Sequence, residues 1–160
     1  MNVIREIIEV FAAVFGIFAS FAGVLSIAFG VITYFRDGRR RICVDTMEAY
    51  KRLQDDVLSK LNVWSRGQIE DAVDTADSIG YDELNVCLAK IEHFCVGVSR
   101  GVYDFETFYQ LAHGYFDSES GLKDKLEPLL EIKLSEAEED YYNNLHKVWA
   151  RMEERSKRPL

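Results

Sequence analysis

Proline, cysteine and positive charge are scarce in this chain of 160 residues, and each shortage excludes a class of protein. Two Pro and ten Gly are too few for a collagen-like or proline-rich chain, while 12% aromatic residues are too many for a disordered one. Three Cys without metal-type spacing form neither a disulfide scaffold nor a zinc module. A formal charge of −8 argues against a nucleic-acid partner, because such proteins need a basic surface to release phosphate counterions.

A long uncharged segment near the N-terminus is the strongest signal in the sequence. Residues 10–34 read VFAAVFGIFASFAGVLSIAFGVITY, and a helix of about 25 residues is about 37 Å long, enough to cross a hydrocarbon core of about 30 Å. The preceding residues 1–9 include two Glu, whereas a cleaved signal peptide begins with a positive region. We therefore expect an uncleaved transmembrane helix over residues 10–35.

Basic residues set the expected orientation of this helix. Four arginines follow the segment, and a lone Arg5 precedes it. The four are Arg36, Arg39, Arg40 and Arg41. The positive-inside rule then predicts a single-pass protein with residues 1–9 outside and the C-terminal domain in the cytoplasm. The same arginines could also pair with anionic headgroups of membrane lipid, at about 1 kcal/mol each near the surface.

Small residues form a regular stripe inside the segment, at alternating spacings of four and three. The stripe consists of Ala12, Gly16, Ala19, Gly23, Ser26, Gly30 and Thr33. Such a stripe lets two helix backbones approach closely, and its period predicts a left-handed crossing within a homo-oligomer. The alternative is that Gly and Ala are simply common in membrane helices.

The rest of the chain predicts helices and no strands. Residues 36–66 form a basic junction and an amphipathic helix, and residues 67–160 form an all-helical domain, with the segment WSRGQ around Gly67 as the first breaker. Apolar residues recur in the junction helix at three- and four-residue steps: Met47, Tyr50, Leu53, Val57 and Leu61. Asp37-Gly38 either interrupts this helix or bends it.

Start and stop signals divide the domain into helices. Residues 69–79 form an acidic helix that Gly80 ends, and the next helix starts with Asp82 as N-cap and stops at Gly101. Its apolar face contains Leu84, Cys87, Leu88, Ile91, Phe94, Cys95 and Val98.

Three further helices follow. Asp104 opens one that contains Phe105, Phe108, Ala112, Tyr115 and Phe116. A short helix from Leu122 is disturbed at Pro128, and a capping box of Ser135 and Glu138 opens the last helix. One face of that helix carries Ala137, Tyr141, Leu145, Val148, Trp149 and Met152. The fold class is therefore mainly α, with a transmembrane helix and a small cytoplasmic bundle of four to six helices.

A short motif resembles a known family. The run LAKIEHFCVGVSRGVYDFETF places Glu92 ahead of Val96-Gly97-Val98, and Gly101 ahead of Tyr103-Asp104. It resembles the bacterial family named domain of unknown function 4760. The resemblance implies an N-terminal membrane helix, a basic junction, a helical domain and a bacterial or phage source, hence an inner (cytoplasmic) membrane. That family is uncharacterised, so the resemblance supplies no catalytic residue.

Glu92 and His93 are the candidate polar site of the domain. Glu92 borders the apolar face, where we expect it to accept hydrogen bonds from a Tyr, Trp or Arg across the bundle. Neighbours on a helix do not face each other, so the two are not expected to act as a pair. We expect no catalytic residue, cofactor or metal site, since no nucleophile elbow, phosphate loop or metal-binding His pair occurs.

Two functions remain open from the sequence. The favoured one is a non-enzymatic, membrane-anchored interaction protein that self-associates through its transmembrane helix and presents an acidic helical domain to an unknown cytoplasmic protein. The alternative is a membrane-active effector or regulator in phage defence, counter-defence or toxin–immunity. Ser20, Ser26 and Thr33 are the mildly polar uncharged residues of the segment, which disfavours a water-filled pore.

Overall fold

The computed structural model describes the backbone of residues 2–75, 79–116, 121–136 and 142–157, and their side chains except for 2–20, 79, 128 and 132–136. All regular elements in this part of the chain are helices, which confirms the mainly α fold class. The chain divides into two compact units, residues 1–41 and 42–160. The second unit contains the hydrophobic core.

The first helix, α1, runs from Asn2 to Leu53 and is continuous through Asp37-Gly38. A single glycine inside a helix costs about 1 kcal/mol relative to alanine, which a helix of this length tolerates. A π-helical turn, η1 (Gln54–Leu58), follows directly, and a short helix, α2 (Ser59–Val63), follows the π-turn. The extra residue in a π-turn shifts the register, and both Val57 and Leu58 are buried.

The chain first leaves helical geometry at Trp64, and α3 (Arg66–Asp74) follows. The break predicted in the segment WSRGQ around Gly67 is confirmed, but it falls at Trp64 and Ser65, and Gly67 itself lies inside the first turn of α3. Ser65 and Gln68 form a capping box: the Gln68 side chain accepts from the Ser65 amide at 2.9 Å, and the Ser65 hydroxyl accepts from the Gln68 amide at 3.3 Å. These two bonds fix the start of α3 one residue before the glycine.

Helix α4 (Ile79–Ser99) begins earlier than predicted. Gly80 therefore lies in its first turn and is not a stop, and Asp82 is not its N-cap. Gly80 has a packing role instead: the Trp64 ring lies against it so closely that a Cβ added at Gly80 would be 2.9 Å from the ring. The predicted stop at the other end is confirmed: Gly101 has a φ of 73°, and the helix ends two residues before it.

Helices α5 (Phe105–Phe116), α6 (Leu122–Glu136) and α7 (Asn143–Ser156) complete the second unit. The predicted disturbance at Pro128 is wrong, since α6 runs through that position while Leu126, Leu129 and Leu130 are buried on either side of it. Ser135 lies inside α6 and does not open the last helix, and Ala137, Glu138 and Tyr141 lie outside the described residues.

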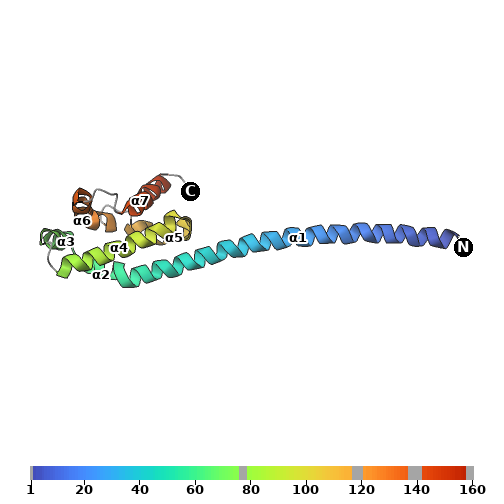
Figure 1. Ribbon diagram of the computed structural model, residues 1–160, viewed down its shortest axis with the longest axis horizontal. Helices are drawn as coiled ribbons and strands as arrows, with labels where there is room; N and C mark the ends of the chain where they lie inside the picture. Colours follow the sequence, from blue (N-terminus) through green and yellow to red (C-terminus); the bar gives the residue numbers. More distant parts are fainter. Residues whose placement is uncertain (1, 76–78, 117–120, 137–141, 158–160) are drawn as a thin grey trace. The chain divides into compact units, whose positions relative to one another are not determined.

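The core joins the end of α1 to all the later helices. Figure 1 shows α3 next to α6 and α4 next to α7, and these pairs make the most extensive helix contacts of the unit. The apolar face predicted for α4 is buried from Leu84 to Val98, as are those of α5 and α7 apart from a half-buried Tyr115. The apolar face predicted for the junction helix is also buried, with one exception: Met47 is 45% exposed, and its neighbour Thr46 is fully buried instead.

Candidate functional site

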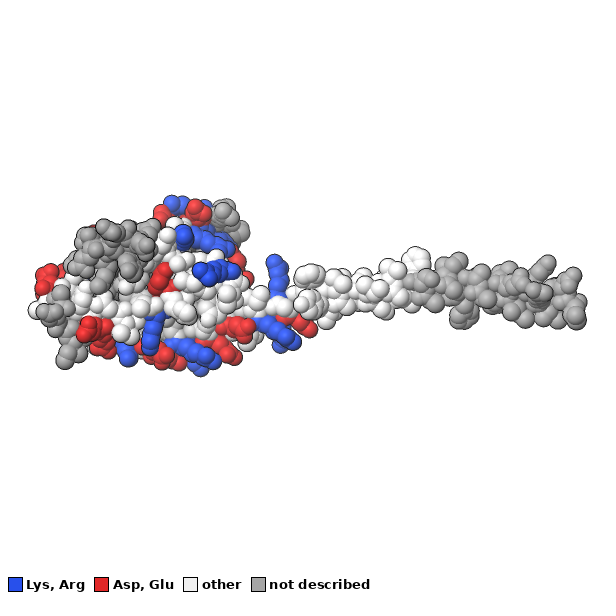
Figure 2. Space-filling view, viewed as in Figure 1, with Lys and Arg blue, Asp and Glu red and all other residues white. Residues whose placement is uncertain are grey.

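The described part of α1 in the first unit carries exposed apolar side chains on every side. From Phe21 to Phe35 each residue is exposed, and Figure 2 shows no charge on this stretch. The large apolar residues are 49–77% exposed: Phe21, Val24, Leu25, Ile27, Phe29, Val31, Ile32, Tyr34 and Phe35. Surfaces of this kind are rare on proteins that face only water and indicate an interaction with lipid or protein.

Part of the predicted membrane segment falls outside the described side chains. Residues 10–20, and with them the stripe residues Ala12, Gly16 and Ala19, belong to that part of α1. Among the side chains that are described, no helix carries an apolar stretch long enough to cross a membrane.

The described half of the small-residue stripe is open. Gly23, Ser26, Gly30 and Thr33 are all exposed, and the continuous helix places them along one side of α1. A Cβ added at Gly23 or Gly30 would meet no atom within 4 Å. The fold of the chain itself therefore does not require glycine at these positions.

The arginine cluster (Arg36, Arg39, Arg40 and Arg41) follows immediately on α1, and all four side chains are exposed. Tyr34 and Phe35 precede it as an edge-to-face pair with ring centroids 5.9 Å apart. Aromatic and then basic residues in this order are typical of a helix that leaves a bilayer.

Glu92 and His93 point to different places, as expected for helix neighbours. The half-buried Glu92 carboxylate accepts from the Asn144 backbone and side-chain nitrogens at 3.1 and 2.8 Å, and from the Leu145 amide at 2.8 Å. The predicted Tyr, Trp or Arg partner is therefore wrong, because α7 presents its first-turn amides to α4 at this point. Tyr142 occupies the N-cap position of α7 with a φ of 68°, and its side chain makes no capping hydrogen bond. Glu92, from α4, supplies the acceptor for the first amides of α7 instead.

The remaining motif residues shape the turn from α4 to α5. The Tyr103 ring lies against Gly97 and stacks on Phe94, with ring centroids 5.2 Å apart. The Asp104 carboxylate caps α5 by accepting from the Thr107 amide at 2.7 Å, as the sequence predicted. Of the motif that resembles the uncharacterised family, Glu92, Gly97, Gly101, Tyr103 and Asp104 therefore have structural roles here.

Thr46 is a key residue that the sequence reasoning missed. Its fully buried hydroxyl accepts from the Asp104 amide and donates to the Ile42 carbonyl, both at 2.7 Å. The bond from Asp104 joins α1 to the start of α5, while the bond to Ile42 stays within α1. The available signal was its spacing, since positions 46, 50, 53 and 57 share one helical face, and a polar residue on a buried face needs a partner.

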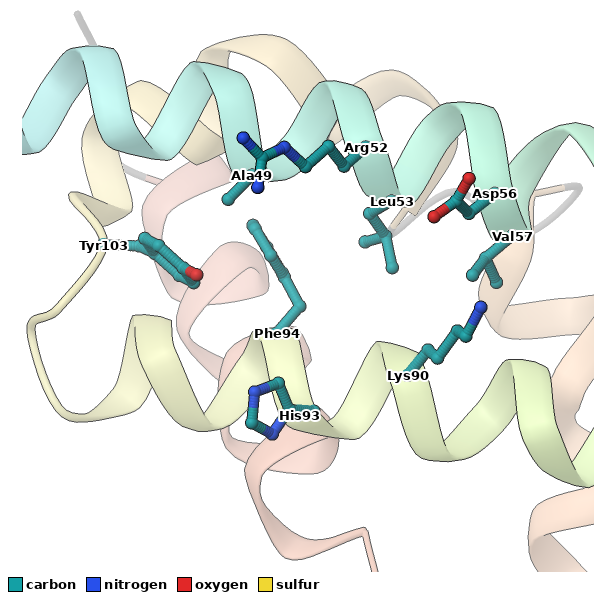
Figure 3. A pocket seen from close by; sticks show the side chains of 9 residues that line it. All are labelled: Ala49, Arg52, Leu53, Asp56, Val57, Lys90, His93, Phe94 and Tyr103. Carbon is teal, nitrogen blue, oxygen red and sulfur yellow. The ribbon is translucent and has the colours of Figure 1, made fainter.

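A groove of about 190 Å³ lies between the α1–η1 segment and α4. Figure 3 shows Lys90 reaching from α4 toward Asp56, and Arg52 extending over Phe94 and Tyr103. Its lining residues are Ala49, Arg52, Leu53, Asp56, Val57, Lys90, His93, Phe94 and Tyr103. Two cations and one carboxylate over an apolar floor suit the binding of a small charged molecule, and the lining offers no paired nucleophile and base.

The titratable groups most affected by folding are buried thiols and phenols. Burial raises the pKa of the Cys95 thiol well above its ordinary value of 9.0, and it raises the pKa of Cys87 in the same direction. Both side chains are fully packed, as predicted, and Cys43 is half-exposed. Within the described residues, no group of three His, Cys, Asp or Glu side chains converges as a metal site.

Comparison with known proteins gives no relative from which a function could be transferred. Neither protein-family models, nor curated proteins, nor solved structures give a match.

Proposed function

We propose that this chain is a non-enzymatic, single-pass membrane-anchored interaction protein. Residues 10–35 form the anchor, the short N-terminus lies outside, and the helical domain faces the bacterial cytoplasm, where it meets a protein partner. The supporting observation is the unbroken apolar surface of α1 from Phe21 to Phe35.

The size of this surface supports a lipid environment for it over an aqueous one. Burying a large apolar side chain is worth about 1.5–3 kcal/mol, so full burial of the nine exposed in this stretch would correspond to roughly 14–27 kcal/mol. Transfer into a bilayer supplies that energy without any contact from the domain. The uncharged stretch contains only hydroxyl groups as polar side chains, which favours an anchor over a water-filled pore.

Self-association through the small-residue stripe is the second part of the proposal. Lipid solvates bulky side chains as well as a partner helix does, so helices associate where small residues allow close backbone contact. The open surroundings of Gly23 and Gly30 support this assignment, because glycine there has no role within the chain itself.

Fractionation of cells that express the full chain tests the anchor. We expect the protein to sediment with membranes without detergent, to remain there in alkaline carbonate, and to enter the supernatant only with detergent. A variant with Ile27→Glu and Ile32→Glu should lose this behaviour, whereas Val63→Glu, on an exposed residue of the domain, should retain it. Recovery of the intact wild-type chain from the soluble fraction would contradict the anchor.

A further inference from the structure

The guanidinium groups of the arginine cluster lack partners within the described residues. None of the four forms an ion pair there, although Asp37 lies three and four residues before Arg40 and Arg41. Other arginines of the chain are engaged: Arg66 pairs with Glu70 at 2.9 Å, and Arg155 pairs with Glu106 at 3.1 Å. The cluster therefore presents unneutralised charge to its surroundings.

The spacing of the cluster matches the depth of a headgroup layer. Five residues separate Arg36 from Arg41, a rise of about 7.5 Å along the helix. The polar layer on one side of a bilayer is about 5–8 Å deep. Tyr34 and Phe35 come just before the cluster, at the level that aromatic side chains prefer.

The directions in which the four arginines point around α1 favour several ligands over one. At about 100° per residue, Arg36, Arg39 and Arg40 lie on one side of α1 and Arg41 lies away from them. Guanidinium groups bind phosphate oxygens through two parallel hydrogen bonds. Arginines that point in different directions would each bind a different phosphate group. A membrane surface can supply phosphates on each side of the helix.

We propose that the arginine cluster selects anionic phospholipids and holds a shell of them around α1. The ligand is a phosphodiester headgroup with net negative charge, such as phosphatidylglycerol, rather than free phosphate. The proposal rests on the membrane anchoring proposed above. Each arginine in contact should favour an anionic over a zwitterionic lipid about fivefold.

Energy transfer from the protein to labelled lipids measures this selection. Cys43 follows Arg41 by two residues and is half-exposed, whereas Cys87 and Cys95 are buried, so a donor dye can be attached to Cys43 in the folded chain. The full chain is reconstituted into vesicles of phosphatidylcholine and phosphatidylglycerol in equal amounts. The acceptor is carried by one lipid or by the other at the same mole fraction.

We expect transfer to labelled phosphatidylglycerol to exceed transfer to labelled phosphatidylcholine, and this excess to fall with salt. A variant with all four arginines changed to Gln should lose the excess, and a variant with all four changed to Lys should keep part of it. The matched control removes four exposed domain charges by K60Q, R100Q, K123Q and K147Q, and it should behave as the wild type.

Three outcomes would overturn the proposal. The first is equal transfer to both lipids in the wild type, and the second is an equal loss of the excess in the control variant. Free inorganic phosphate that abolishes the excess at constant ionic strength is the third, because it would indicate a soluble anion site. Failure of the chain to sediment with vesicles of either lipid is a separate result, which would remove the anchor and this inference together.

Discussion

A methyl group added at Gly97 would lie 2.5 Å from two carbon atoms of the Tyr103 ring. Tyr103 cannot withdraw easily, because it also stacks on Phe94 in the core. The glycine is therefore needed for close packing, since its place in α4 is otherwise ordinary helix. Gly114 in α5 has no such constraint, because nothing lies within 4 Å of a Cβ added there.

We expect Gly97→Ala to lower the free energy of unfolding of the domain by about 1–3 kcal/mol through overpacking. Gly114→Ala is the matched control and should raise it by about 0.5–1 kcal/mol, because alanine is the better helix former. Thermal denaturation of the full chain in detergent, followed by circular dichroism, measures both. Equal effects of the two substitutions would contradict the packing role of Gly97.

Glu92 lies in α4 but caps the N-terminus of α7. Glu92→Ala should lower the free energy of unfolding by about 1–2 kcal/mol, since two amides and one side-chain nitrogen of α7 lose their acceptor. Glu92→Gln retains an acceptor oxygen and should cost less. His93→Ala, at the exposed neighbouring position, is the control, and a loss as large as that of Glu92→Ala would argue against the cap.

Among whole elements, α1 combines two different surfaces along one continuous helix. Residues 21–35 are apolar on all sides, whereas Tyr50, Leu53 and the buried Thr46 face the domain core. Amphipathic pattern alone identifies the second surface, and uninterrupted hydrophobicity identifies the first.

Gly23→Leu combined with Gly30→Leu tests the role of the stripe. We expect self-association in detergent or lipid to weaken at least about tenfold, because the leucines hold the helices apart. The helix itself gains stability, by up to about 1 kcal/mol per site, so unfolding does not explain a loss. Ala28→Leu, on the opposite side of α1, should leave association unchanged. Association that resists the double substitution would refute the predicted interface.

The whole domain should lose stability in alkaline solution. Burial raises the pKa of Cys87 and Cys95 above 9.0, and of Tyr50 and Tyr115 above 10.0, so the unfolded chain releases these protons first. The contribution is fully present below about pH 9 and is lost as the pH rises further, because the unfolded state then binds fewer protons. Denaturation midpoints from about pH 7 to about pH 10 measure it. Cys95→Ala should flatten the profile, and a wild-type profile already flat over this range would contradict the prediction.

Whether a feature could be predicted from the sequence depends on its physical origin. The buried faces of α4, α5 and α7 could be read from spacing, because a 3.6-residue period directly reflects which side of a helix avoids water. Element boundaries at Gly67, Gly80 and Pro128 could not, since each is decided by a capping pair or by packing from elsewhere in the chain. The same holds for the candidate site: the sequence identified Glu92 as half-buried, but its partners come from a helix 52 residues away.

The sequence by itself determined the helical class, the apolar faces, the caps at Asp104 and Gly101, and the order of apolar segment, arginines and acidic domain. These features depend on local conformation and on periodicity, which neighbouring residues carry. Only the tertiary structure decided that Thr46 joins α1 to α5, that Glu92 caps α7, and that Tyr103 occupies the space left by Gly97. Contacts of this kind arise between residues far apart in the chain, so no local pattern contains them.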